Sequence, residues 1–257
     1  MKNRTKLPNI YLGIIMTLMY LPIVLIVIYS FNESKLTSVW GGFSLKWYEQ
    51  LFKDREMMEA IKNSIILAFS SCILSAIIGT IGAVGLARMN FKTKGMIEYL
   101  SNIPIMIPEI ILGMVFLAFF SFINLPKGML TLIIAHTTFC IPYILMMVKA
   151  RLVGIDKSLA EAAKDLGASE IRAFFDITLP LIMPAVLSGS LLAFAMSLDD
   201  VVISIFVTGP KVTTLPIKIY TQMKFGVTPE INALCAIMLV VTIGLILVST
   251  RIGRKKI

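Results

Sequence analysis

Residues 154–180, GIDKSLAEAAKDLGASEIRAFFDITLP, form the longest polar interruption in the second half of a very apolar sequence. Ser158 and Glu161 have the spacing of a capping box, in which a hydroxyl and a carboxylate satisfy two free N–H groups at a helix start. Alanine and leucine then favour helix as far as Gly167, because glycine can adopt the left-handed conformation that closes a helix. Ser169 can begin a second short helix. The stretch therefore predicts two short helices between apolar runs.

One side of the first short helix is apolar. A helix of about eight residues is marginal alone in water, so this side is expected to pack against something. A linker lying on its own chain and a surface that docks on a partner both satisfy that requirement. The side consists of Leu159, Ala162, Ala163 and Leu166.

Composition places the chain in a membrane. Of its 257 residues 57% are hydrophobic, the mean hydropathy is +0.87, and runs of about twenty apolar residues recur. Only helices or closed barrels cross a bilayer, and runs of this length indicate helices. The net charge of +9 comes from Lys and Arg dispersed between the runs, which indicates membrane orientation and no nucleic-acid partner. The expected class is an all-α membrane protein surrounded by lipid.

Six spans are expected. The first is interpreted as an uncleaved span, because its apolar run exceeds the core of a signal peptide and no small-residue cleavage site follows it. The spans are 9–30, 62–87, 99–122, 129–149, 181–207 and 232–250.

The positive charges give the orientation. Lys and Arg concentrate before the first span, after the second, in the loop 150–180 and after the sixth span. Both termini and the loop are therefore expected in the cytoplasm. The segment 31–61 is then outside, where Trp40, Trp47 and Tyr48 suit a helix lying at the membrane interface.

Two features suggest close packing and a cavity. Small residues recur every four positions in the second span, which predicts a tight helix interface either within the bundle or between subunits. In the third span Pro104 and Pro108 interrupt the backbone hydrogen bonds, so a kink lining a cavity is expected, with Glu109 directly after it. His136 is the only histidine, and the sequence assigns it no role.

Asp199 and Asp200 lie side by side in the fifth span. Inserting an aspartate at the centre of a membrane helix costs about 2.5–3.5 kcal/mol, so such residues face the protein interior or a water-filled path. A structural pair and a substrate path are the two alternatives. Neighbouring helix residues point about 100° apart, so the two are not expected to bind one ligand group. No basic residue lies deep in any span, which favours a cationic permeant through Asp199, Asp200 and Glu109.

The loop resembles the EAA loop of ABC-transporter permeases. The string Glu161-Ala162-Ala163, then Gly167, then 177–180, ITLP, fills every defining position. In that family the loop forms coupling helices that sit in a groove of the cytoplasmic ATPase. The resemblance implies ATPase coupling by Glu161, Ala162, Ala163, Gly167, Leu179 and Pro180.

Nearly the whole chain resembles the second permease subunit of bacterial spermidine/putrescine importers. The matching segments include 198–202, LDDVV, and 206–210, FVTGP; where this family often has Asp after the proline, the chain has Glu109. The resemblance implies a type I ABC importer permease fold as a single domain, 1–257, in a bacterial cell membrane. It also implies a sister permease, an extracytoplasmic polyamine-binding protein and an ATPase dimer that binds ATP and Mg²⁺.

Other functions remain open. No phosphate-binding loop occurs in the sequence, so this chain is expected to be a non-catalytic subunit without a cofactor of its own. ABC permeases for iron, sulfate or other organic cations share the loop. An ion-coupled carrier is disfavoured by the absence of internal symmetry. A protease is disfavoured because adjacent aspartates on one helix cannot converge as a catalytic pair.

Overall fold

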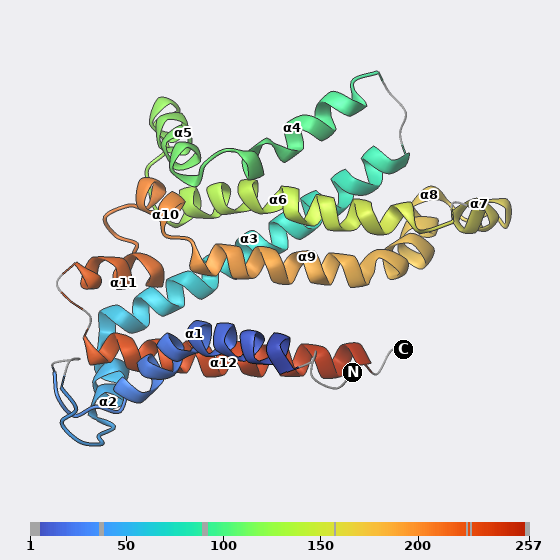
Figure 1. The fold of residues 1–257 in the computed structure, drawn as a ribbon. Helices are drawn as coiled ribbons and strands as arrows, with labels where there is room; N and C mark the ends of the chain where they lie inside the picture. Colours follow the sequence, from blue (N-terminus) through green and yellow to red (C-terminus); the bar gives the residue numbers. More distant parts are fainter. Residues whose placement is uncertain are drawn as a thin grey trace. The chain divides into compact units, whose positions relative to one another are not determined.

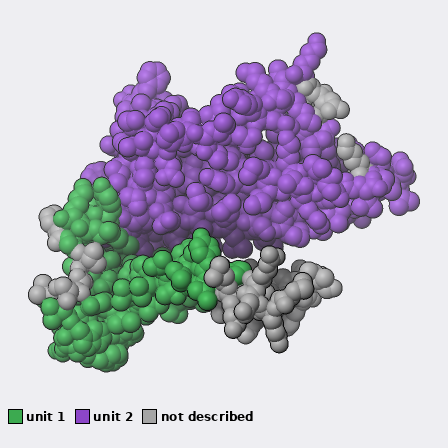
Figure 2. All heavy atoms as spheres, in the orientation of Figure 1, with its two compact units in different colours: residues 1–58, 219–257 green, residues 59–218 purple. Residues whose placement is uncertain are grey.

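The computed structural model describes residues 6–35, 39–88, 92–156, 158–224, 226 and 228–254. Within these ranges the chain is helical, apart from one isolated β-bridge between Asn32 and Phe43. It divides into two compact units, residues 1–58 with 219–257 and residues 59–218 (Figure 2). The expected all-α fold is confirmed.

The first unit contains α1 (Lys6–Tyr29), α2 (Lys46–Lys53) and α12 (Pro229–Arg254). Both α1 and α2 pack against α12, and Figure 1 shows α1 running alongside it. The described side chains of α1 are almost all exposed. An apolar helix with so little protein around it fits a span that faces lipid.

The loop between α1 and α2 is organised by Asn32. The Asn32 side chain accepts a hydrogen bond from the Gly41 N–H at 2.7 Å and donates one to the Val39 carbonyl at 2.8 Å. The Trp47 indole N–H donates to the Asn32 carbonyl at 2.6 Å. Trp47 is only 5% exposed, so it holds this loop and does not act as the interfacial anchor expected from the sequence. Trp40 is 50% exposed, so the prediction of an interfacial anchor applies to this residue.

The second unit is built around α6 (Met129–Val153). The helix packs on α4, α9 and α10, and eleven of its residues are buried. The Cβ position of Gly79 would lie 3.0 Å from Ile144, and that of Gly189 would lie 3.1 Å from the same residue. Small residues thus let their helices approach α6 closely, and the small-residue face of the second span packs within the bundle. Besides the short helices of the loop 154–180, this unit contains α4 (Lys94–Met106), α5 (Glu109–Phe122), α9 (Leu179–Asp199) and α10 (Val202–Val207). The helices α3 (Arg55–Arg88) and α11 (Leu215–Met223) each continue from one unit into the other.

Four helices are long and apolar enough to cross a membrane by themselves, among the described residues. Each overlaps one of the expected spans 9–30, 62–87, 129–149 and 181–207. The expected span 99–122 is a pair of helices, α4 and α5, bent by 108°, and counting this pair gives up to five. The sixth expected span lies in α12, whose apolar part within the side chains described is Pro229–Ile243.

The expected span 181–207 is not a continuous helix. It contains α9, which ends at Asp199, and the separate short helix α10. The loop after α6 contains α7 (Ser158–Asp165) and α8 (Glu170–Ala173), as expected, followed by a π-helix, η1 (Phe174–Thr178), that the sequence did not predict.

Candidate functional site

The break between α4 and α5 follows from proline chemistry. Pro108 stands immediately before α5, and Ile107 is extended with ψ of 133°. A residue that precedes proline is sterically excluded from helical geometry, and proline is favoured at the start of a helix. The expected kink is therefore a full break, which makes Glu109 the first residue of α5.

Asp200 creates the second break. Its carboxylate accepts hydrogen bonds from the N–H of Ile203 at 3.2 Å and from the N–H and hydroxyl of Ser204, both at 2.8 Å. An aspartate that binds backbone N–H groups three and four residues ahead begins a new helix in the manner of an N-cap. The sequence-based placement inside a helix is therefore wrong for Asp200, which lies outside either helix, whereas Asp199 is the last residue of α9.

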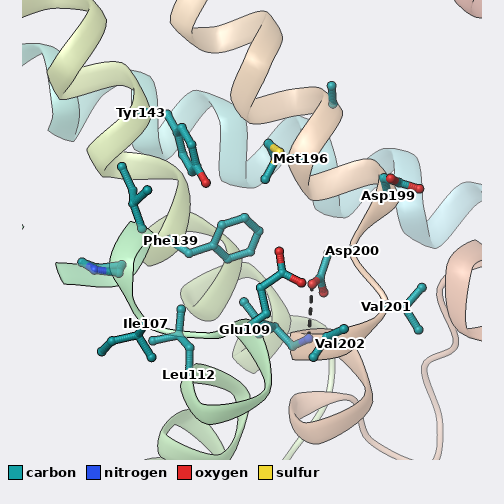
Figure 3. Close-up of a pocket in the computed structure, with 14 residues that line it drawn as sticks. Ile107, Glu109, Leu112, Phe139, Tyr143, Met196, Asp199, Asp200, Val201 and Val202 are labelled. Carbon is teal, nitrogen blue, oxygen red and sulfur yellow. Dashed lines mark hydrogen bonds between the residues drawn. The ribbon is translucent and has the colours of Figure 1, made fainter. Parts of the chain in front are cut away.

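The two breaks meet at one cleft of about 380 Å³. Figure 3 shows the Glu109 side chain reaching toward Asp200, whereas the Asp199 carboxylate points away from both. The two aspartates point apart, although not for the helical reason given above, because Asp200 is extended with ψ of 122°. Phe139, Tyr143 and Met196 supply apolar and aromatic surface. The lining is completed by Pro104, Ile105, Ile107, Leu112, Ala195, Val201, Val202 and Ile203.

The cleft carries negative charge. Three of its lining residues are acidic, and none of those the structure describes there is Lys, Arg or His. Glu109 and Asp199 are exposed, and within the described chain no hydrogen bond or ion pair engages either side chain. Asp200 differs, because its side chain is only 5% exposed and is fully engaged. Two free carboxylates and one committed carboxylate therefore line the cleft.

His136 lies directly behind Asp200, a relationship that the sequence did not reveal. The imidazole is completely buried, with Nε2 at 3.4 Å from the Asp200 carboxylate and 3.0 Å from the Ser204 hydroxyl. Its Nδ1 lies 2.8 Å from the Ser197 hydroxyl. A lone histidine in an apolar span was the available signal, but nothing local connects it to the α9–α10 break.

The loop 154–180 has the expected helices with a different start. The Ser158 N–H donates to the Asp156 carboxylate at 2.9 Å, which lowers the pKa of Asp156. Ser158 is the first residue of α7, and its N–H is bound by Asp156 and not by the Glu161 carboxylate that the capping box predicted. Stabilisation from this lowered pKa is present above the ordinary aspartate pKa and is lost as the pH falls through the lowered value.

The end of α7 agrees with the sequence. Gly167 has φ of +88°, in the left-handed region, and the Ala168 N–H donates to the Ala163 carbonyl at 3.0 Å. Ser169 accepts from the Arg172 N–H at 3.3 Å and so caps α8. Both local predictions, the closing glycine and the capping serine, are confirmed.

The expected coupling residues lie in two places. Glu161, Ala162 and Ala163 are on α7, whereas Leu179 and Pro180 begin α9, where Leu179 packs against the core. Four large apolar side chains of the loop are exposed. Their exposed fractions are 47% for Leu159, 90% for Leu166, 71% for Ile171 and 57% for Phe175.

Known proteins share both the sequence and the fold. Residues 75–254 match the family model described as binding-protein-dependent transport system inner membrane component. The chain is 41% identical over 253 residues to the spermidine/putrescine transport system permease protein PotC of Haemophilus influenzae, covering 98% of each. It is 45% identical over 230 residues to the putrescine transport system permease protein PotI of Escherichia coli K12, covering 87% of this chain and 82% of that one.

Two solved structures have the same architecture. One is a bacterial ABC transporter involved in the import of the acidic polysaccharide alginate, with a TM-score of 0.74, 15% identity, and coverage of 96% of this chain and 94% of the other. The other is the MetNI methionine ABC transporter, with a TM-score of 0.64, 21% identity, and coverage of 79% and 98%. At these identities the likeness is one of fold, that of an ABC importer permease.

Proposed function

The chain belongs to the binding-protein-dependent transport system inner membrane components, and from that premise we propose that it is the permease subunit that admits polyamines, spermidine and putrescine, to the cell. Two relatives whose names specify these substrates align with more than four fifths of the chain. A family member of this kind is a non-catalytic membrane subunit.

The charge of the cleft is the observation that supports polyamines most directly. A polyamine carries ammonium groups separated by methylenes, so its path needs spaced carboxylates with apolar surface between them. Glu109 and Asp199 offer free carboxylates, and Phe139 and Tyr143 offer ring faces that attract cations. An anion such as sulfate would meet only negative charge along this lining.

The contacts are suited to passage. Each site along a transport path must bind weakly enough to release its ligand. Two separate, solvated carboxylates satisfy this requirement better than one enclosed acidic pocket. Because Asp200 is already hydrogen-bonded, it contributes charge near the path with little capacity for a direct contact.

Energy is supplied by partners. The exposed apolar side of α7 and α8 suits docking on a cytoplasmic ATPase dimer, which binds the ATP and Mg²⁺. A sister permease completes the pathway, and an extracytoplasmic binding protein delivers the polyamine. ATP binding closes the ATPase dimer, the loop transmits this motion, and the permease pair opens outward; hydrolysis returns it to the inward-facing state.

Reconstituted transport tests the proposal. The purified complex, in vesicles with its binding protein, is expected to take up labelled spermidine or putrescine only with ATP and Mg²⁺. Uptake driven by an ion gradient without ATP would support a secondary carrier. ATP-dependent uptake of sulfate or ferric iron without polyamine uptake would assign the chain to another branch of the ABC permeases.

A further inference from the structure

His136 connects the acidic cleft to the centre of the bundle. Its Nε2 faces the Asp200 carboxylate and the Ser204 hydroxyl, and its Nδ1 faces the Ser197 hydroxyl. Ser197 lies 2.9 Å from the hydroxyl of Ser71 on α3. One buried polar chain therefore joins α3, α6, α9 and α10 at the α9–α10 break.

The hydrogen-bond donors and acceptors determine how the imidazole is used. The Ser204 hydroxyl donates its hydrogen to Asp200, so toward His136 it can only accept. The Asp200 carboxylate also only accepts. Both groups around Nε2 are thus acceptors, and Nε2 must carry a hydrogen. Nδ1 can accept from Ser197 or donate to it, and either arrangement leaves the Nε2–H directed at the break.

We propose that His136 is a positioning residue for transport: its Nε2–H holds Asp200 and Ser204 against α6, fixing the α9–α10 break and thereby the direction of the Asp199 carboxylate at the cleft. Asp200 directly follows Asp199, the last residue of α9, and its carboxylate accepts the N–H groups at the start of α10. A small displacement of Asp200 would therefore change both the direction of the Asp199 side chain and the position of α10. The transport consequence rests on the proposed function, whereas the geometry of the histidine does not.

The burial of the network explains why the effect would be large. His136, Ser197, Ser204 and Ser71 are at most 3% exposed. A buried polar group that loses its partner incurs the full desolvation cost, and hydrogen bonds to charged groups are stronger than neutral ones. An apolar residue at position 136 would leave Asp200 with one donor fewer in a site that water does not readily reach.

Two amide variants test whether the position of the donor matters. The amide nitrogen of His136→Gln can approach the location of Nε2 and donate toward Asp200, whereas that of His136→Asn can approach only the location of Nδ1, near Ser197. We expect maximal polyamine uptake per assembled complex to fall about tenfold or more in His136→Asn and clearly less in His136→Gln. Equal uptake by the two variants, or wild-type uptake by His136→Asn, would overturn the proposal.

A spectroscopic experiment needs no transport measurement and observes the native histidine, with His136→Gln used only to assign its resonances. In the complete complex containing ¹⁵N-histidine, the His136 resonances are identified by their absence in His136→Gln, because this chain has one histidine. We expect a protonated Nε2, with a signal that shifts in Asp200→Asn and stays in place in Asp199→Asn. A bare Nε2, or an equal response to both aspartate variants, would refute the positioning role. A confirmed signal in a complex that does not transport polyamines would reject the proposed substrate alone.

Discussion

The Arg88 guanidinium at the end of α3 donates a hydrogen bond to the hydroxyl of Thr178, the last residue of the π-helix η1. Thr178 is buried, and it stands where the loop 154–180 continues into α9. The link thus joins a long apolar helix to the segment that follows the exposed apolar side chains of α7 and α8. Movement of the loop is expected to reach α3 through this contact.

Removing the Thr178 hydroxyl tests that link. In Thr178→Val the Arg88 guanidinium loses its acceptor, at a cost of about 1 kcal/mol to the local structure. We expect ATP hydrolysis by the assembled complex to continue while uptake falls. Thr178→Ser is the matched control, since it retains the hydroxyl and should retain uptake. Unchanged uptake in Thr178→Val would show that the contact does not transmit the motion.

Gly167 allows a second test of coupling. Its φ of +88° suits glycine, and a β-branched residue there would add roughly 1–2 kcal/mol of strain and displace the turn between α7 and α8. We expect Gly167→Val to abolish uptake with normal membrane insertion. Gly167→Asn is the control, because asparagine tolerates the left-handed region better. Both are measured as uptake relative to the amount of permease in the membrane.

Bulk on α7 gives a related prediction. Ala163→Trp places a large ring on the helix that is proposed to enter the ATPase groove, so we expect the ATPase subunits to dissociate from the purified complex and uptake to be lost. Lys92→Trp, on a loop residue outside this surface, serves as the control. Normal ATP-driven uptake by a well-expressed Ala163→Trp variant would refute docking at this helix.

Local chemistry explains which features the sequence could predict. Gly167 and Ser169 were identifiable because a left-handed turn and a helix cap depend on residues a few positions apart. Pro108 indicated an interruption between α4 and α5 because its effect falls on the residue directly before it. Each of these signals is complete within one turn of helix.

The second break depends on residues that the sequence does not bring together. Residues 181–207 read as one apolar run, and helix propensity alone continues it past Asp200. The helix stops because Asp200 binds the N–H groups of Ile203 and Ser204 while His136, from another helix, supports the carboxylate. Tertiary contacts therefore determine the geometry of the acidic residues, although their presence and their sign of charge were evident from the sequence.

Packing between α5 and α10 can be tested independently of transport. A Cβ on Gly113 would lie 2.5 Å from the ring of Phe206, so Gly113→Ala is expected to destabilise the protein by about 1–3 kcal/mol and lower its Tm. Combining it with Phe206→Leu should recover part of the loss, because the smaller side chain relieves the overlap. Gly85→Ala, which would meet no atom within 4 Å, is the control and should leave Tm unchanged or slightly higher.

The acidic residues of the cleft are expected to respond unequally to neutralisation. Glu109 and Asp199 present free carboxylates, so Glu109→Gln and Asp199→Asn should reduce polyamine uptake through lost charge while the complex assembles normally. Asp200→Asn differs, because an amide nitrogen placed near the N–H groups of Ile203 and Ser204 replaces an acceptor with a donor. We expect that variant to lose thermal stability together with uptake.

The measurement is labelled spermidine uptake beside the amount of assembled complex and its Tm for each variant. Binding to the isolated extracytoplasmic receptor provides the control, since that step precedes the permease and should not change. If Asp199→Asn lost assembly in proportion to uptake, its role would be structural and the substrate path would lie elsewhere. Full uptake by the double variant Asp199→Asn, Asp200→Asn would rule out a path that depends on the two aspartates, because Glu109 would then be the one acidic residue left among those that line the cleft.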